Sequence, residues 1–221
     1  MSKKVAVIIA GCGFQDGAEI HETTCALLAI DLAGADAVCF APNKMQSTVV
    51  NHLTGSNDSE AGRNTLTEAA RIARGNIKAT AAANIDELDA LIMPGGFGAA
   101  MNLSNFGTAG ENCELDADVE NLIKAFVRAK KPIGAICIAP ATLARALQNA
   151  GVSANLTIGN DAGVANKIAA MGHKHQDCAA SDCVIDAENK IVTTPAYMSA
   201  TSIGEVWSGV KNLVNAVLEM S

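Results

Sequence analysis

Short apolar runs recur along this chain, and each ends in a turn that is followed by a helical pattern. Residues 4–10, 36–41, 89–93 and 132–136 are rich in Val, Ile, Leu and Ala and stop at glycine, proline or cysteine. Runs of this length fit strands that are buried on both faces. Their alternation with helices predicts an α/β fold with a mostly parallel sheet covered on both sides. Ligands then bind beyond the carboxyl ends of the strands, where the turns lie.

Helical periodicity and helix-ending residues predict the segments that cover this sheet. The predicted helices run from 20 to the glycine at 34 and over 64–73, 119–130, 139–150, 162–171 and 199–220. Asp16 and Glu19 have the spacing of a capping box at the first of these helices. Brief strands are expected near 77–79 and 156–158, and residues 183–186 and 190–194 predict a hairpin.

Two long segments, 43–62 and 104–116, show no clear periodicity and are predicted as loops. Long loops in compact domains are more often functional than idle, so we expect them to wall a site or to contact a second copy of the chain. No repeat or low-complexity linker divides the 221 residues. α/β folds of this length commonly form one domain, and we therefore expect a single domain over 1–221.

Composition and charge exclude several classes of function. The formal charge of −7, without a Lys/Arg cluster, argues against binding to nucleic acid or to an anionic membrane. The apolar run near the N-terminus is too short for a signal peptide or a membrane span, so a cytoplasmic protein is expected. The seven cysteines are scattered and odd in number, which predicts free thiols that are mostly buried.

Cys137 is the thiol whose position most suggests chemistry. It directly follows the apolar run 132–136, and Pro140 suits the first turn of the helix that comes next. A thiol at a helix N-terminus meets a positive dipole and free backbone N–H groups, which favour the thiolate and can hold an oxyanion. The alternative is a buried structural cysteine at a strand end, because cysteine is among the most buried residue types. Position alone leaves both interpretations open.

A pair of glycines and a glutamate offer candidate partners for this thiol. Gly95 and Gly96 follow a buried strand, and the Gly96 amide could complete an oxyanion hole with the amide of Ile138. Glu22 lies one helical turn beyond Glu19, and it could exchange a proton with Cys137 if burial raises its pKa. The alternatives are a simple tight turn for the glycines and a solvated helix acid for Glu22.

Other polar clusters give weaker signals for a metal or a cofactor. His173, His175, Cys178 and Cys183 have spacings that match no standard zinc site, so no metal is expected. His21 is adjacent to Glu22 but points roughly 100° away around the helix, which favours a packing or interface role.

A dinucleotide cofactor is not expected either. Gly11-Cys12-Gly13 lacks the third glycine of the dinucleotide-binding fingerprint. The second strand ends at Ala41-Pro42, where that fingerprint needs an acidic residue.

Several longer strings resemble a known superfamily. Those at 17–23 (Gly-Ala-Glu-Ile-His-Glu-Thr), 93–104 (Met-Pro-Gly-Gly-Phe-Gly-Ala-Ala-Met-Asn-Leu-Ser) and 134–140 (Gly-Ala-Ile-Cys-Ile-Ala-Pro) together resemble the ThiJ/PfpI superfamily. Those at 11–13, 51–55 (Asn-His-Leu-Thr-Gly) and 191–198 (Ile-Val-Thr-Thr-Pro-Ala-Tyr-Met) look like its ElbB branch, the enhancing lycopene biosynthesis proteins. The match extends over nearly the whole chain.

The resemblance implies a fold, an assembly and an activity. It implies a flavodoxin-like three-layer sandwich of the class I glutamine amidotransferase-like type, usually a homodimer. Cys137 would be the nucleophile, Glu22 its carboxyl partner, and the Gly96 and Ile138 amides the oxyanion hole. The implied activity is a weak glyoxalase that acts on glyoxal, and in some cases methylglyoxal, without cofactor, metal or glutathione.

Three departures from the superfamily's patterns narrow these expectations. Superfamily peptidases carry a histidine directly after the nucleophile, where this chain has Ile138. Glutamine amidotransferases carry a His-x-Glu pair, where this chain has His173-Lys174-His175, and Gly159-Asn160 fills a region that holds a histidine in other members. Proteolysis and glutamine hydrolysis are therefore not expected, and Glu22 is expected to be the base alone.

The residues and the resemblance leave two candidate functions, one enzymatic and one non-enzymatic. In the first, the Cys137 thiolate adds to a small aldehyde, Glu22 moves a proton between the two carbons, and the thioester is hydrolysed to the 2-hydroxy acid glycolate. In the second, the protein is not an enzyme: Cys137 is a redox sensor or the anchor of a binding site, held as a sulfinate by the same donors. A link to isoprenoid metabolism rests on the family name only.

Overall fold

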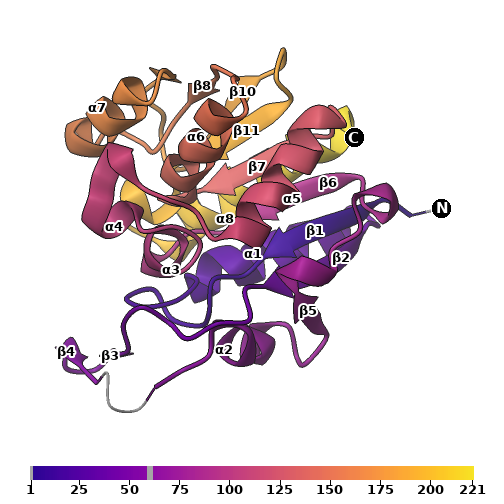
Figure 1. The fold of residues 1–221 in the computed structure, drawn as a ribbon. Coiled ribbons are helices and arrows are strands. Elements are labelled where there is room, and N and C mark those ends of the chain that lie inside the picture. The colour runs from indigo at the N-terminus through magenta and orange to yellow at the C-terminus, as the bar shows by residue number, and fades with distance from the viewer. Residues whose placement is uncertain (1, 59–61) are drawn as a thin grey trace.

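The computed structural model describes residues 2–58 and 62–221, and its centre is a seven-stranded sheet (Figure 1). The strands of this sheet are β1 (Lys4–Ile8), β2 (Asp36–Ala41), β5 (Ile77–Ala79), β6 (Ala90–Met93), β7 (Ile133–Ile136), β10 (Val184–Asp186) and β11 (Ile191–Thr194). Their order is β10-β11-β7-β6-β1-β2-β5, and all neighbours are parallel except β10 with β11. The predicted α/β class, the parallel sheet and the hairpin are confirmed.

Helices cover both faces of the sheet and give the three-layer, flavodoxin-like sandwich. On one face α1 (Ile20–Leu32) and α8 (Ile203–Met220) pack against each other, and on the other α5 (Ala117–Arg128) packs beside α6 (Ala139–Asn149) (Figure 1). Within 2–58 and 62–221, no helix combines the length and the apolar character that crossing a bilayer requires.

Shorter elements surround these layers. They are the helices α2 (Thr65–Ile72), α3 (Phe97–Met101), α4 (Phe106–Ala109) and α7 (Ala162–Ala170), and the strand pairs β3 (Val50–Asn51) with β4 (Ser56–Asn57) and β8 (Asn155–Leu156) with β9 (Lys174–His175). Short 3₁₀ turns are η2 (Thr80–Ala82), η3 (Ile85–Glu87), η4 (Gly110–Asn112) and η5 (Ala196–Met198).

The first helix does not have the predicted capping box. Glu19 is its N-cap, and the Glu19 carboxylate accepts a hydrogen bond of 2.7 Å from the Glu22 amide. Asp16 is fully buried elsewhere and accepts a hydrogen bond of 2.8 Å from the Val50 amide. The helix begins after Glu19 because the chain from Gly13 still forms a turn, closed by a hydrogen bond from the Gly17 amide to the Gly13 carbonyl.

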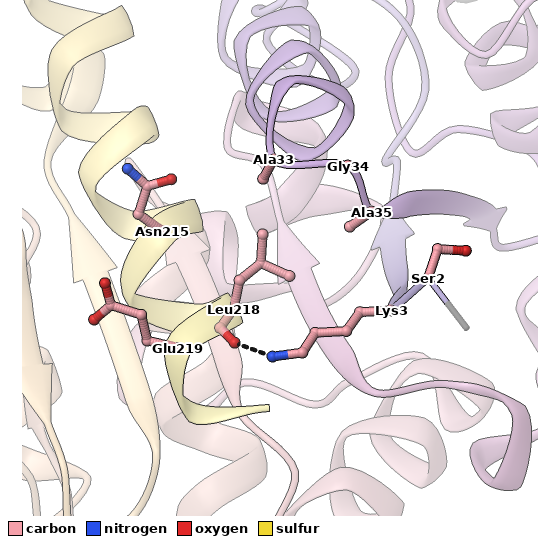
Figure 2. A pocket seen from close by; sticks show the side chains of 8 residues that line it. All are labelled: Ser2, Lys3, Ala33, Gly34, Ala35, Asn215, Leu218 and Glu219. Carbon is pink, nitrogen blue, oxygen red and sulfur yellow. Dashed lines mark hydrogen bonds between the residues drawn. The ribbon is translucent and has the colours of Figure 1, made fainter.

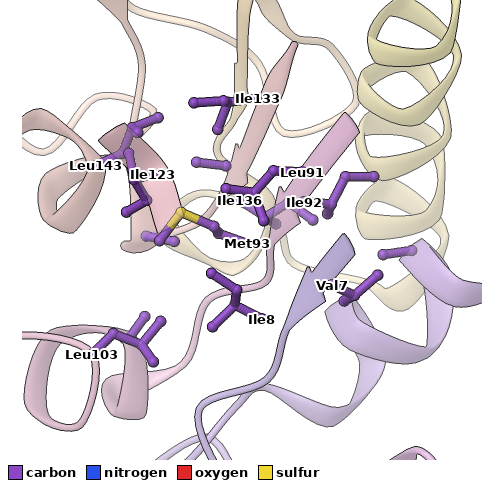
Figure 3. Close-up of a cluster of buried hydrophobic side chains, with 14 of the residues drawn as sticks. Val7, Ile8, Leu91, Ile92, Met93, Leu103, Ile123, Ile133, Ile136 and Leu143 are labelled. Carbon is purple, nitrogen blue, oxygen red and sulfur yellow. The ribbon is translucent and has the colours of Figure 1, made fainter. Parts of the chain in front are cut away.

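The hydrophobic core lies on both sides of the central strands. Figure 3 shows Ile8, Ile92, Met93 and Ile136 on the strands, with helix residues such as Leu143 packed against them. These side chains are fully buried, and the buried set forms one continuous cluster. A core of this kind holds the strand ends, and the turns after them, in fixed positions. One domain over 1–221 stays a prediction.

The two predicted loops contain short regular elements. Segment 43–62 holds the β3–β4 pair, although residues 59–61 lie outside the described part of the chain. Segment 104–116 holds α4 and η4, and a bridge between Ser104 and Leu115 closes its base. Asp116 ends this segment and caps α5, so the helix begins at Ala117, two residues before the predicted start.

Candidate active site

The turn after β7 presents Cys137 in a conformation that L-residues rarely adopt. Its φ is +63°, and its amide donates a hydrogen bond of 2.9 Å to the carbonyl of Thr194 at the end of β11. Ile138 is the N-cap of α6, and a proline lies in the first turn of that helix. Non-glycine residues held at positive φ often mark functional sites, because the fold must offset their strain. The predicted sharp strand-to-helix turn is present, and the Cys137 side chain is 7% exposed.

Gly95 and Gly96 bring a second backbone turn against this thiol. A Cβ at Gly95 would lie 2.5 Å from the Cys137 Cβ and 2.7 Å from the Glu22 Oε2, so only glycine fits there. Gly96 has a φ of +87° and abuts the Gly17 carbonyl and the Glu19 amide. The amides of Gly96 and Ile138 both donate hydrogen bonds to the Cys137 sulfur. The two predicted oxyanion-hole donors therefore meet at one atom.

Glu22 is a buried acid in contact with Cys137. It is fully buried on α1, and the Cys137 thiol donates a hydrogen bond to its carboxyl group. Its Oε2 accepts a bond of 3.0 Å from the Gly95 amide, and its Oε1 accepts one of 3.3 Å from the Tyr197 amide. The alternative of a solvated helix acid does not hold, and the expected contact between Glu22 and Cys137 is present.

Burial governs the protonation of both groups. The pKa of Glu22 is raised to about 8, first by burial and then by the nearby charge of Glu19. The pKa of the Cys137 thiol is raised well above its usual range, first by burial and then by Glu22. The Gly96 and Ile138 amides lower it by less than these effects raise it. Burial and Glu22 together therefore favour the thiol over the thiolate, and of the two interpretations left open by the sequence, the helix N-terminus by itself does not produce a thiolate.

Cys137 and Glu22 consequently titrate as one unit. Both are protonated in acid, and the pair loses its first proton as the pH rises through about 8. The proton that remains lies on the thiol, which donates a hydrogen bond to the Glu22 carboxylate, in a site that already holds two amide donors. This arrangement can generate a nucleophile, stabilise an oxyanion and carry a proton between neighbouring atoms.

The histidines considered as metal ligands have structural partners. His173 is buried, its Nε2 donates to the Ala144 carbonyl at 2.8 Å, and its Nδ1 accepts from the Ala154 amide at 3.2 Å. The Nε2 of His175 accepts from the Ile158 amide at 3.3 Å. Over the described residues, no three His, Cys, Asp or Glu side chains lie together in a way that could hold a metal ion.

Sequence reasoning missed three backbone groups of the site. These are the Gly95 amide and the Tyr197 amide on Glu22, and the Thr194 carbonyl on Cys137. The string 191–198, which contains Thr194 and Tyr197, carries the resemblance to the ElbB branch and predicts no role in the site. Backbone groups leave no residue-type signal. The turn after β6 brings the Gly95 amide to Glu22, and the chain path at the end of β11 brings the Thr194 carbonyl to Cys137 and the Tyr197 amide to Glu22. His21, predicted to have a packing or interface role, is exposed, and its Nδ1 lies 2.8 Å from the Tyr197 hydroxyl.

A cavity lies away from this site, at the opposite end of the sheet. It measures about 510 Å³ and is lined by Ser2, Lys3, residues 33–35, Asn215, Leu218 and Glu219. Figure 2 shows Lys3 reaching the end of α8, where its Nζ donates to the Leu218 carbonyl at 2.6 Å. The cavity is therefore at the amino end of β1, whereas Cys137 follows the carboxyl end of β7. A second cavity of about 240 Å³ lies between η2 and α5.

Two curated relatives match almost the entire chain. The "ES1 protein homolog, mitochondrial" of Rattus norvegicus is 39% identical over 99% of this chain and 84% of its own length. The human "Glutamine amidotransferase-like class 1 domain-containing protein 3, mitochondrial" is 40% identical over 99% of this chain and 83% of its own. Their names do not locate this chain, and its cytoplasmic location stays a prediction.

A solved structure and a family model agree with this relationship. The isoprenoid biosynthesis protein with amidotransferase-like domain from Ehrlichia chaffeensis is 36% identical, covers 99% of both chains and superposes with a TM-score of 0.92. The model of the DJ-1/PfpI family matches residues 3–202, which include the Cys137 turn, the glycine turn and Glu22. This chain belongs to the DJ-1/PfpI family.

Proposed function

We propose that this protein is a cofactor-independent glyoxalase of the ElbB-like branch, which converts glyoxal to glycolate through a thiohemiacetal on Cys137. The observation that carries the proposal is the buried Glu22 carboxyl group, which is hydrogen-bonded to the thiol. A carboxyl group whose pKa is about 8 can both take and give a proton near neutral pH. The resemblance stated from the sequence supplies the substrate class.

The first step forms the bond between sulfur and carbon. In the dyad with one proton, the Glu22 carboxylate takes the proton of the Cys137 thiol as the sulfur attacks one aldehyde carbon of glyoxal. The carbonyl electron pair moves to oxygen, where the Gly96 and Ile138 amides can donate to the developing oxyanion. The oxygen then takes the proton from Glu22, which leaves a thiohemiacetal and a Glu22 carboxylate.

The second step is an internal redox isomerisation. The Glu22 carboxylate removes the hydrogen of the carbon that bears sulfur as a proton and returns it to the second carbon, while the hydroxyl proton of the first carbon moves to the oxygen of the second. The first carbon is thereby oxidised to a thioester and the second is reduced to an alcohol, so no external oxidant is required. Water then cleaves the thioester to glycolate and restores the Cys137 thiol.

Purified protein should turn glyoxal into glycolate, measured by proton NMR of the reaction mixture. Cys137→Ala should abolish turnover, and Glu22→Gln should lower it on the order of 100-fold, because general acid–base catalysis contributes at least that much. Cys178→Ala is the matched control, since this partly exposed thiol lies outside the dyad and its substitution should leave the rate unchanged. Full activity in either dyad variant would rule out the mechanism.

One observation favours a redox sensor as the second candidate. A Cys137 sulfinate could accept hydrogen bonds from the Gly96 and Ile138 amides and from protonated Glu22. The raised pKa of the thiol weighs against it, because oxidation follows thiolate character. After mild peroxide treatment at neutral pH, mass spectrometry should therefore find Cys137 oxidised no faster than Cys12 or Cys113. Selective oxidation of Cys137 would favour the sensor over the enzyme.

A further inference from the structure

The turn after β11 contacts both members of the dyad. The Thr194 carbonyl, at the end of β11 where the turn begins, accepts a hydrogen bond of 2.9 Å from the Cys137 amide. The Tyr197 amide donates a hydrogen bond of 3.3 Å to the Glu22 Oε1. This turn contains η5, and within it Ala196 is fully buried with a φ of +42°. A non-glycine residue held at positive φ costs free energy, so contacts outside the turn must hold this conformation.

Tyr197 supplies such a contact through its side chain. Its hydroxyl lies 2.8 Å from the His21 Nδ1, and the two rings lie 5.8 Å apart between their centroids. Burial and nearby acidic groups raise the pKa of the Tyr197 hydroxyl, which keeps it protonated and able to donate. His21 and Glu22 are consecutive on α1, so Tyr197 binds one with its side chain and the other with its backbone amide.

We propose that the bond between Tyr197 and His21 is a latch that positions the turn after β11 and, through it, the amide that binds Glu22. Both residues act through Glu22 and neither touches the reacting atoms, so they are positioning residues. The proposal rests on the proposed pairing of Glu22 with Cys137, and it assigns a role to His21, which precedes Glu22 on α1. When the bond between Tyr197 and His21 is broken, the Tyr197 amide can move away from the Glu22 Oε1.

The charge on Glu22 should report the state of the latch. The charged or titratable groups that act on its carboxyl group are Glu19 on the same helix and Cys137 on the opposing turn. Glu22 in turn raises the pKa of the Cys25 thiol, also on α1, and of the Tyr197 phenol across from it. An amide hydrogen bond favours the carboxylate form and lowers the pKa of Glu22. Loss of this bond should therefore move the first titration step of the dyad to higher pH.

The test is the pH dependence of Cys137 alkylation by iodoacetamide, followed on the Cys137 peptide by mass spectrometry. Tyr197→Phe removes the hydroxyl and keeps the ring and the amide, and it should move the first inflection upward by about half a pH unit or more. His21→Ala should give the same shift. The double variant should shift no further than either single variant, because both remove one bond.

The control and the contradicting outcome use the same assay. Thr24→Ala changes another exposed residue of α1 and should leave the inflection in place. An unshifted inflection in both latch variants, even with a lowered melting temperature, would overturn the proposal, because a structural bond alone moves stability only. The assay needs no substrate, so failure of glyoxal turnover would not be confused with failure of the latch.

Discussion

At the scale of single residues, the site depends on positions where a side chain is absent or strained. Gly95 lies against both Cys137 and Glu22, and its amide donates a hydrogen bond to the Glu22 Oε2. Cys137 itself is held at a φ of +63° by its bond to the Thr194 carbonyl. The close contact of thiol and acid is therefore set by backbone geometry as much as by the two reactive side chains.

Gly95→Ala should damage both stability and the dyad. The added methyl group would overlap the Cys137 Cβ at 2.5 Å and the Glu22 Oε2 at 2.7 Å, so the two side chains must separate. We expect a loss of about 1–3 kcal/mol in the free energy of unfolding, measured by urea denaturation, together with loss of glycolate formation. Gly204→Ala is the control, because its methyl group would meet only Ser202 Oγ at 3.8 Å. If Gly95→Ala and Gly204→Ala had the same free energy of unfolding and the same rate of glycolate formation, the close packing of Gly95 against Cys137 and Glu22 would be contradicted.

Glu22 should make stability fall as the pH rises. Its pKa is about 8 in the folded chain against an ordinary 4.5, so between these values the folded state binds more protons than the unfolded state. Its contribution is fully present below 4.5 and is lost as the pH rises through about 8. The slope from this group approaches about 1.4 kcal/mol per pH unit.

Glu22→Gln should remove that slope, as measured by denaturation at a series of pH values between 5 and 8. Glu188→Gln, in the exposed β10–β11 turn, should leave the slope as it is in the wild type. If the stability profile of Glu22→Gln keeps the wild-type slope, Glu22 is not the buried acid that the structure describes.

At the scale of elements, the sequence predicts which segments are strands and helices more accurately than it predicts the turns and caps that join them. The β-branched runs, the β10–β11 hairpin and the helix patterns are confirmed, because burial and periodicity act within a few residues. The capping box at Asp16 was wrong, since the turn from Gly13 delays α1 until Glu19 can cap it. The protonation of Cys137 stayed open for a related reason: the helix N-terminus is evident in the sequence, whereas the depth of burial, which raises the thiol's pKa, is not.

Asp116 should be the cap on which α5 depends. Its carboxylate accepts from the Asp118 and Val119 amides, and it pairs with Lys44 at 3.0 Å across the two long loops. Asp116→Ala should lower the free energy of unfolding by about 1–2 kcal/mol, measured by urea denaturation. Lys44→Met removes only a partly exposed ion pair and should cost less than about 1 kcal/mol. A smaller loss in Asp116→Ala than in Lys44→Met would contradict the capping role.

At the scale of the whole molecule, parallel strand order brings distant segments to one edge of the sheet. The turns after β6, β7 and β11 meet there with the start of α1, which is why Glu22, Gly95, Cys137 and Tyr197 are neighbours. The sequence predicted this edge as the site, and it predicted the contact of Glu22 with Cys137. Tyr197 was not predicted, because the path of the turn after β11 depends on packing against α1.

The homodimer implied by the resemblance stays a prediction that one experiment can decide. Ile20, Leu28 and Leu32 are 44%, 45% and 69% exposed on α1, which leaves apolar surface that a second copy could bury. Sedimentation equilibrium should therefore give twice the chain mass of 22.6 kDa. A single species at the chain mass, across micromolar concentrations, would contradict the dimer.

The coupled titration of Cys137 and Glu22 is tested most directly by the rate of Cys137 alkylation as a function of pH, in the wild-type protein and in Glu22→Gln. In the wild type, we expect a first rise as the pH passes about 8, where the dyad loses its first proton, and a second rise at higher pH. In Glu22→Gln the first rise should vanish and a single step should remain. Profiles of the same shape in both proteins would contradict the account.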